Sequence, residues 1–207
     1  IKENIVSLIH QLQSDGHTVE PIEFDLLDHI VPAYYVLTTA EASSNLSRFD
    51  GVRYGHQTTK AVADLNEFYK ANRSEGFGKE VKRRILLGTF VLSAGHYDAY
   101  FSKAQQVRRL LVNKTTALFS QYDALIIPTA PSTAMPIGSN SDDPIAMYLA
   151  DIYTVFANLT GLPAISIPLF KHSNGMPFGL QVLTNKLEEE TLLQLSTSLL
   201  KKYRVNG

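Results

Sequence analysis

The side chains best suited to chemistry in this sequence are six histidines and one adjacent pair of serines, Ser43 and Ser44. No histidine stands in an HExxH motif or at another metal-ligand spacing; they are His10, His17, His29, His56, His96 and His172. The sequence also lacks a GxSxG nucleophile elbow and a Walker-type phosphate loop. The serine pair lies in a helical, glycine-poor context, which favours helix packing over catalysis. We therefore expect neither a metal site nor a complete catalytic set in this chain.

Two short apolar runs in the second half of the chain predict the strands that position any site. Ala124–Ile127 and Ala164–Ile167 both stop at a proline, as buried strands often do. Between them, Met147–Leu159 carries apolar residues at helical spacing. A strand, a helix and a strand in this order predict a crossover unit with two parallel strands. Ligands of such sheets bind beyond the carboxyl ends of the strands, which we place at residues 128–131 and 166–168.

The remaining periodicity predicts an α/β fold. Apolar residues at three- and four-residue steps predict helices over residues 2–13, 26–47, 64–72, 99–119 and 187–201. Strands are expected at His17–Ile22 and Phe178–Leu183, the second after an Asn174-Gly175 hairpin turn. Loops are expected at residues 48–56 and 73–77, where glycines interrupt the pattern. We find no linker rich enough to divide the chain into two domains.

Composition narrows the possible functions. Nineteen Lys and Arg against twenty Asp and Glu give a net charge of −1, which provides no reason to expect direct binding to a nucleic-acid backbone. The absence of cysteine excludes disulfides and thiolate catalysis within the chain, and it fits a reducing cytoplasm. No apolar run approaches the length of a membrane span. The chain starts at Ile1 rather than at methionine, and we expect it to be cut from a longer protein.

Four segments carry a resemblance to a known family. They are residues 33–55 (AYYVLTTAEASSNLSRFDGVRYG), 73–108 (RSEGFGKEVKRRILLGTFVLSAGHYDAYFSKAQQVR), 122–131 (YDALIIPTAP) and 142–168 (DDPIAMYLADIYTVFANLTGLPAISIP). In this order and at this spacing, they resemble the A subunits of bacterial glutamyl-tRNA(Gln) amidotransferases, a branch of the amidase signature family. Other members of that family share the ANLTGLPAISIP type of segment but generally lack RFDGVRYG together with RSEGFGKEVKRRI.

The resemblance implies an amidase-signature fold, which is a mixed central sheet covered by helices on both faces. It also implies an amidase that releases ammonia from glutamine. The family uses a serine nucleophile, a second serine joined through a cis peptide, and a lysine base. Those residues lie in a glycine- and serine-rich signature that this sequence does not contain. We therefore expect residues 1–207 to be the C-terminal portion of a single amidase-signature domain, without a catalytic residue and inactive alone.

What the chain contributes, by resemblance, is the pocket for glutamine. An arginine in the family's KRRI segment holds the α-carboxylate of glutamine, and an aspartate holds its α-ammonium group. These roles fall on Arg84 and Asp151, with Arg83 as the neighbour that is easily confused with Arg84. A tyrosine completes the pocket, and we favour Tyr35 over Tyr34. Without the resemblance, Asp151 would be read as an exposed residue in the middle of a helix, where burial without a partner is costly.

One further position leaves an alternative open, and another departs from the family's pattern. Thr129, between Pro128 and Pro131, either shapes the pocket wall or belongs to a strand exit stiffened by proline. Phe156 stands where the family usually has proline, so the helix near Asp151 is expected to differ from the family's.

Partners and cofactors also follow from the resemblance. The family passes ammonia to a B subunit, which uses ATP and Mg to activate Glu on mischarged tRNA, and a small C subunit braces the pair. The chain itself is expected to bind glutamine and no cofactor, metal or membrane, and to contact tRNA only through the B subunit in the cytoplasm. Two alternatives remain, namely an amidase-signature hydrolase for another amide and a non-catalytic binding or scaffold module.

Overall fold

The computed structural model describes residues 1–137 and 150–204. Contacts between Cα atoms divide the chain into two compact units. Unit 1 comprises Ile1–Val31 together with Arg108–Gly207, and unit 2 comprises Pro32–Val107.

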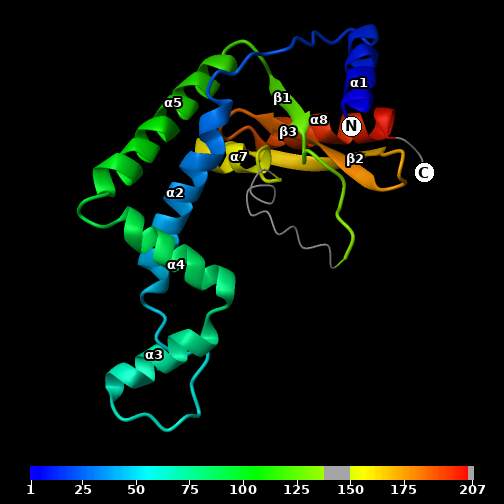
Figure 1. The fold of residues 1–207 in the computed structure, drawn as a ribbon. Helices are drawn as coiled ribbons and strands as arrows, with labels where there is room; N and C mark the ends of the chain where they lie inside the picture. The colour runs from blue at the N-terminus through cyan, green and yellow to red at the C-terminus, as the bar shows by residue number, and fades with distance from the viewer. Residues whose placement is uncertain (138–149, 205–207) are drawn as a thin grey trace. The chain divides into compact units, whose positions relative to one another are not determined.

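Unit 1 contains a three-stranded sheet in the order β1-β3-β2 (Figure 1). The strands are β1 (Ala124–Pro128), β2 (Ala164–Lys171) and β3 (Pro177–Thr184), and β3 is antiparallel to both neighbours. The predicted parallel direction of β1 and β2 is therefore confirmed. The two strands are not hydrogen-bonded neighbours, however, because β2 turns back into β3 and β3 takes the place between them.

The turn from β2 to β3 is the hairpin that Asn174-Gly175 predicts. Gly175 has a φ of +82°, a backbone conformation that glycine adopts without steric cost. The His172 amide donates to the Met176 carbonyl at 2.9 Å, and the Asn174 side-chain oxygen accepts from the Met176 amide at 3.0 Å. These bonds fix the register of β3.

The core of unit 1 lies between one face of the sheet and two helices, α1 (Lys2–Ser14) and α8 (Glu189–Tyr203). Leu180 and Val182 alternate along β3 and are completely buried against these helices. The other buried members of this core are Leu8, Leu12, Ile167, Leu169, Phe170, Leu192 and Leu199. Asp15, just after α1, accepts a hydrogen bond from Lys202 Nζ at 2.8 Å and another from the Tyr203 hydroxyl. The two helices are thus joined at their ends as well.

Three sequence predictions in unit 1 are wrong in part. His17–Ile22 forms no strand; Pro21 has no amide hydrogen to give to a ladder. Residues 166–168 are not a strand end, since β2 continues to Lys171 with a register irregularity between Ile167 and Phe170. The predicted crossover helix is replaced by a turn at residues 150–153 and the short helix α7 (Thr154–Thr160), while residues 144–149 lie outside the described residues.

Unit 2 is helical. It holds most of α2 (Leu27–Leu46), all of α3 (Leu65–Gly76) and α4 (Lys79–Val91), a π-helical turn η1 (Asp98–Ser102), and the start of α5 (Lys103–Leu118). Helix α3 continues through most of the loop predicted at residues 73–77 and ends at Gly76, before the extended Phe77. None of the helices in the described residues has the length and apolarity to cross a membrane.

Helices α2 and α4 approach each other closely. A Cβ added at Gly88 on α4 would lie 1.9 Å from the backbone oxygen of Thr39 on α2 and 2.7 Å from the Cβ of Ser43. The Ser43 and Thr89 hydroxyls share a hydrogen bond at 3.0 Å across the same contact. Ser43 therefore serves helix packing, as its sequence context indicates.

Candidate active site

Arg84 lies near the middle of α4, with its guanidinium held on two sides. Its Nε donates to Glu80 Oε1 at 3.1 Å, one helical turn earlier. Its Cζ lies 5.8 Å from the centre of the Tyr35 ring, within the range of a cation–π contact. Because Glu80 is bonded to Nε, the edge of the guanidinium formed by its two terminal nitrogens can pair with a planar carboxylate ligand. Unit 2 therefore brings two of the three predicted pocket residues together, Arg84 and Tyr35.

The neighbours of these two residues occupy different positions. Tyr34 packs edge-on against Tyr35, with ring centres 5.3 Å apart, whereas the ring that faces the Arg84 guanidinium is that of Tyr35. Arg83 Nη1 also reaches Glu80, at 3.3 Å, but Arg83 lies in a surface depression with Leu86 and Leu87. The Arg83 side chain is 50% exposed, whereas that of Arg84 is 35% exposed. The members of each pair therefore have different surroundings, and the choice of Arg84 and Tyr35 as pocket residues stays a prediction.

Glu80 is a functional candidate that sequence reasoning missed. Its carboxylate contacts both arginines, and the spacing of three and four residues along a helix was the available signal. Because Glu80 is half exposed, its two ion pairs contribute little to stability. The pair with Arg84 fixes the direction of that side chain.

Asp151 belongs to unit 1, so the structure describes it apart from Arg84 and Tyr35. The prediction that it lies in the middle of a helix is wrong, since it stands in the turn that precedes α7. Its backbone oxygen accepts from the amides of Thr154 and Val155 at 3.0 and 3.1 Å. The residue is exposed at the start of a helix whose next turn is buried.

The short helix α7 is held by residues from other elements. Arg108 Nε donates to the Leu159 carbonyl at 2.9 Å, near the C-terminus of the helix, where Gly161 adopts a left-handed cap. Phe156, at the position where the family usually has proline, is buried and packs edge-on against Phe24 at 5.5 Å. Phenylalanine is therefore accommodated by aromatic packing, and α7 remains helical there.

Thr129 meets two residues at the carboxyl end of β1. Its amide donates to the Gly179 carbonyl at 3.1 Å, and its hydroxyl lies 2.7 Å from that of Ser166. A Cβ at Gly179 would approach the Ser166 hydroxyl to 2.6 Å, so glycine is needed beneath this pair. A role for Thr129 in a pocket wall stays a prediction.

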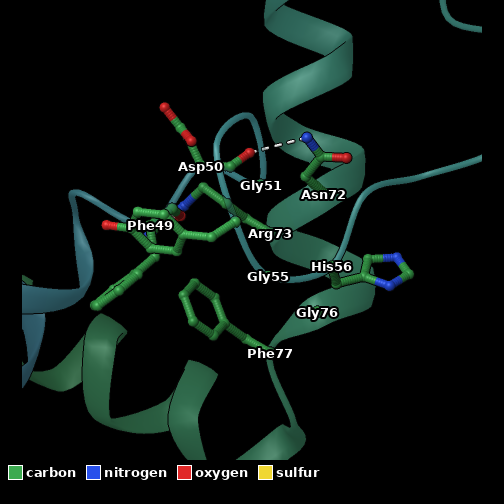
Figure 2. Close-up of a pocket in the computed structure, with 10 residues that line it drawn as sticks. Phe49, Asp50, Gly51, Gly55, His56, Asn72, Arg73, Gly76 and Phe77 are labelled. Atoms are coloured by element: carbon green, nitrogen blue, oxygen red, sulfur yellow. Dashed lines mark hydrogen bonds between the residues drawn. The ribbon is translucent and has the colours of Figure 1, made fainter.

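The motif RFDGVRYG folds as a loop around helix α3. Asn72 is only 2% exposed and bridges two loop segments. It donates to the Asp50 carbonyl at 2.9 Å (Figure 2) and accepts from the Thr58 amide at 2.8 Å. Arg73 donates to the carbonyls of Leu46 and Phe49, both at 2.8 Å. Asn72 and Arg73 line a small open pocket of about 180 Å³.

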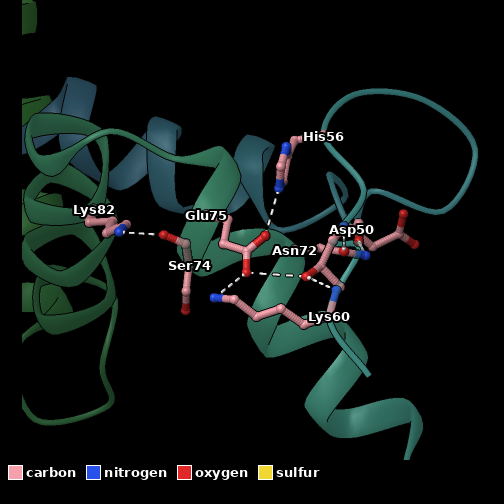
Figure 3. Close-up of polar contacts among 8 residues, drawn as sticks. Asp50, His56, Lys60, Asn72, Ser74, Glu75 and Lys82 are labelled. Atoms are coloured by element: carbon pink, nitrogen blue, oxygen red, sulfur yellow. Dashed lines mark hydrogen bonds and ion pairs between the residues drawn. The ribbon is translucent and has the colours of Figure 1, made fainter. Parts of the chain in front are cut away.

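A second part of this loop is tied to α3 by charge. Glu75 contacts Lys60 Nζ at 2.7 Å, His56 Nε2 at 2.8 Å and the Thr58 hydroxyl at 3.1 Å (Figure 3). These hydrogen bonds, that of Lys60 first, lower the pKa of Glu75 from its ordinary 4.5 to about 2. The segments that make the sequence most distinctive, RFDGVRYG and RSEGFG, are thus one folded structure.

In residues 1–137 and 150–204, no three His, Asp or Glu side chains gather as a metal-binding group. Ser44, like Ser43, lies within α2, and its carbonyl accepts from the Ser47 hydroxyl at 2.6 Å. Unit 2 thus presents the Arg84 guanidinium beside the Tyr35 ring, and unit 1 presents Asp151 in the turn ahead of α7; their roles in substrate binding stay predictions.

Comparison with known proteins gives these features a context. A family model described as Amidase matches residues 1–193. The A subunit of glutamyl-tRNA(Gln) amidotransferase from Brevibacillus brevis is 50% identical over 196 residues, which are 95% of this chain and 40% of that protein. The corresponding protein from Symbiobacterium thermophilum is also 50% identical over 196 residues, with the same coverage.

Solved structures agree with these relatives. The crystal structure of the A subunit of glutamyl-tRNA(Gln) amidotransferase from Thermotoga maritima matches with a TM-score of 0.72 and 36% identity, over 100% of this chain and 39% of that one. A crystal structure described as amidase matches with a TM-score of 0.74 at 22% identity, over 98% of this chain and 42% of that one, and so shows the fold alone. The chain spans about 40% of the length of the curated relatives it matches. On the strength of a family match that runs through residues 1–193, this chain belongs to the amidase family.

Proposed function

We propose that this chain is the C-terminal part of the glutaminase subunit of a tRNA-dependent amidotransferase. The intact subunit hydrolyses glutamine and supplies ammonia to convert Glu-tRNA(Gln) to Gln-tRNA(Gln). The observation that carries the proposal is the 50% identity to the A subunit of such an enzyme along 95% of this chain. Residues 1–207 are then one portion of a single amidase-signature domain.

In this proposal the chain binds glutamine by its two charged groups. Arg84 pairs with the α-carboxylate through two parallel hydrogen bonds, and Tyr35 supports the guanidinium by stacking. Asp151 pairs with the α-ammonium group. Support comes from the Arg84–Tyr35 contact at 5.8 Å and from the exposed position of Asp151 ahead of α7.

Cleavage of the side-chain amide belongs to the remainder of the subunit, where the family places its Ser-Ser-Lys set. The residues of this chain orient glutamine by fixing two points of its backbone, so that its amide reaches the nucleophile in one position. Such positioning lowers the entropy cost of the reaction. It also selects glutamine over amides that lack either charge, because an unpaired charged group in the pocket is costly.

The partners follow from the same proposal. A B subunit receives the ammonia, uses ATP and Mg, and binds the tRNA, while a C subunit braces the complex in the cytoplasm. The chain itself needs no cofactor. Its net charge of −1 agrees with leaving tRNA contact to the B subunit.

The test compares ammonia release by two forms of the protein. The intact subunit, in complex with its partners, is assayed with glutamine and with the uncharged amide propionamide, and residues 1–207 are assayed alone. We expect the intact form to prefer glutamine strongly and the isolated chain to release no ammonia. A preference for propionamide would favour a different amide hydrolase. Turnover by the isolated chain would contradict the placement of the catalytic residues, and an inactive intact form would favour a binding or scaffold module.

A further inference from the structure

Gln181 is a buried amide on the central strand of unit 1. Strand β3 reads PFGLQVLT, and its neighbours Leu180 and Val182 point into the core against α1 and α8. Because side chains alternate along a strand, Gln181 points to the opposite face of the sheet. It is only 5% exposed. A buried amide in an apolar strand requires a hydrogen-bond partner.

The partner of Gln181 lies in the turn that carries Asp151. Its Nε2 donates to the backbone carbonyl of Tyr153 at 3.1 Å. Tyr153 is the residue before α7 and is two positions from Asp151. The Asp151 carbonyl, in turn, accepts from the first two amides of α7. The strand, the turn and the start of the helix therefore form one hydrogen-bonded series.

Helix α7 depends on such external bonds because it is short. Its seven residues are well below the length at which an isolated helix is stable in water. Arg108 and Gly161 fix its C-terminal end. At the N-terminal end, among the described residues, Gln181 makes the hydrogen bond that joins the turn to the sheet.

We propose that Gln181 is a positioning residue that fixes the Asp151 carboxylate, and through it the selectivity for amide substrates with an α-ammonium group. The inference rests on the proposed function, in which Asp151 binds that ammonium. Loss of the Gln181 bond frees the turn from the sheet, and the carboxylate then pairs less well with its substrate. Because the site of amide cleavage is unaffected, the change falls on substrate binding.

The test uses the intact subunit with its partners and two substrates. Glutamine carries both charges, whereas 5-amino-5-oxopentanoate keeps the carboxylate and the amide but lacks the α-ammonium. We expect Q181M, which keeps the side-chain shape without the amide, to raise KM for glutamine roughly three- to tenfold, the ratio that corresponds to one hydrogen bond. We expect kcat for glutamine, and both constants for the second substrate, to stay within about twofold.

Three further variants control for loss of stability, for failure to fold and for the dependence on Asp151. T184V removes another buried bond of the same strand, from the Thr184 hydroxyl to the Glu188 carbonyl at 3.0 Å, and should not change the ratio of the two KM values. Q181N, whose amide is one carbon shorter, is measured in parallel in case Q181M does not fold. In a D151N background, Q181M should raise KM for glutamine no further.

An equal effect of Q181M or Q181N on both substrates, or no effect on either, would overturn the positioning role. If D151N itself leaves the preference for glutamine unchanged, the role proposed for Asp151 fails, and that result is distinguishable from a failure confined to Gln181.

Discussion

The two residues proposed to bind glutamine, Arg84 and Asp151, are held in different ways. On the arginine side, in unit 2, Arg84 is fixed by a residue four positions earlier on its own helix and by the ring of Tyr35 on a closely packed second helix. On the aspartate side, in unit 1, Asp151 stands in a turn that is joined to the sheet through Gln181, thirty residues further along the chain. The first arrangement is local to two helices, and the second depends on the hairpin.

The two arrangements depend to different degrees on the rest of the fold. The arginine side relies on a backbone approach that glycine alone permits and on an i,i+4 pair whose spacing is supplied by the helix itself. The aspartate side relies on long-range contacts between a strand and a turn, which are present only when the sheet has formed. We therefore expect substitutions on the two sides to separate in their effects.

The largest effect is expected from R84A. Removing the guanidinium leaves the α-carboxylate of glutamine unpaired, and truncation of one partner in a buried, hydrogen-bonded charge pair costs about 2–5 kcal/mol. We expect kcat/KM for glutamine in the intact subunit to fall by roughly 30-fold or more. R83A is the matched control, because Arg83 contacts the same Glu80 while the contact with the Tyr35 ring belongs to Arg84. Equal losses in the two variants would remove the distinction between them.

G88A is expected to disturb Arg84 indirectly, by disrupting the contact between the two helices that carry Arg84 and Tyr35. The added methyl group would lie 1.9 Å from the Thr39 backbone oxygen, so α2 and α4 must separate. Overpacking of this kind costs about 1–3 kcal/mol, and we expect the free energy of unfolding in urea to fall by about 3 kcal/mol. G95A serves as the control, since no atom lies within 4 Å of a Cβ at that position. Similar unfolding curves for the two variants would contradict the close helix contact.

N72A tests whether the loop that contains RFDGVRYG is independent of Arg84 and Asp151. The change leaves the Thr58 amide and the Asp50 carbonyl without their partner, at a cost of about 1–3 kcal/mol. We expect faster hydrogen exchange across residues 50–60, with no change in the KM for glutamine. N45A, which removes an exposed amide bonded to Glu41 at 3.3 Å, is the control. A raised KM in N72A would connect the loop to the pocket.

The smallest effect is expected from the acid titration of Glu75. Its pKa is lower in the folded state, so the charged form stabilises the protein above the ordinary value of 4.5, and this contribution disappears as the pH falls towards about 2. We expect the wild type to exceed E75Q in urea stability at pH 5.5, where the Glu75 carboxylate is largely ionised in both the folded and the unfolded state. The difference should shrink steadily below pH 4.5. A difference that is independent of pH down to 2.5 would show that the carboxylate is not held by charge.

Local patterns in the sequence predicted much of this structure. The helices α1, α2 and α8, the strand β3 and its Asn174-Gly175 turn all follow from periodicity and turn chemistry. The insertion of β3 between β1 and β2 did not follow, because strand order depends on long-range pairing. The strand predicted at His17–Ile22 is absent, and Pro21 within that segment lacks the amide hydrogen that a ladder needs.

The contacts of the candidate site also differ in how far the sequence predicts them. The contact between Arg84 and Tyr35 joins two residues that resemblance had already singled out, and the Glu80 pair could have been read from its spacing. The Gln181–Tyr153 bond joins positions 28 residues apart. Its one signal in the sequence is an amide side chain within an otherwise apolar strand. The turn at Asp151 was missed because apolar spacing continues through it.

The central claim is that this chain binds the two charged ends of glutamine through separate residues. The most direct measurement is kcat/KM of the intact subunit, wild type and its R84A and D151A variants, for three substrates. These are glutamine, 4-aminobutanamide, which lacks the α-carboxylate, and 5-amino-5-oxopentanoate, which lacks the α-ammonium. Our account predicts that R84A spares only 4-aminobutanamide and that D151A spares only 5-amino-5-oxopentanoate. Equal losses on all three substrates in either variant would contradict it.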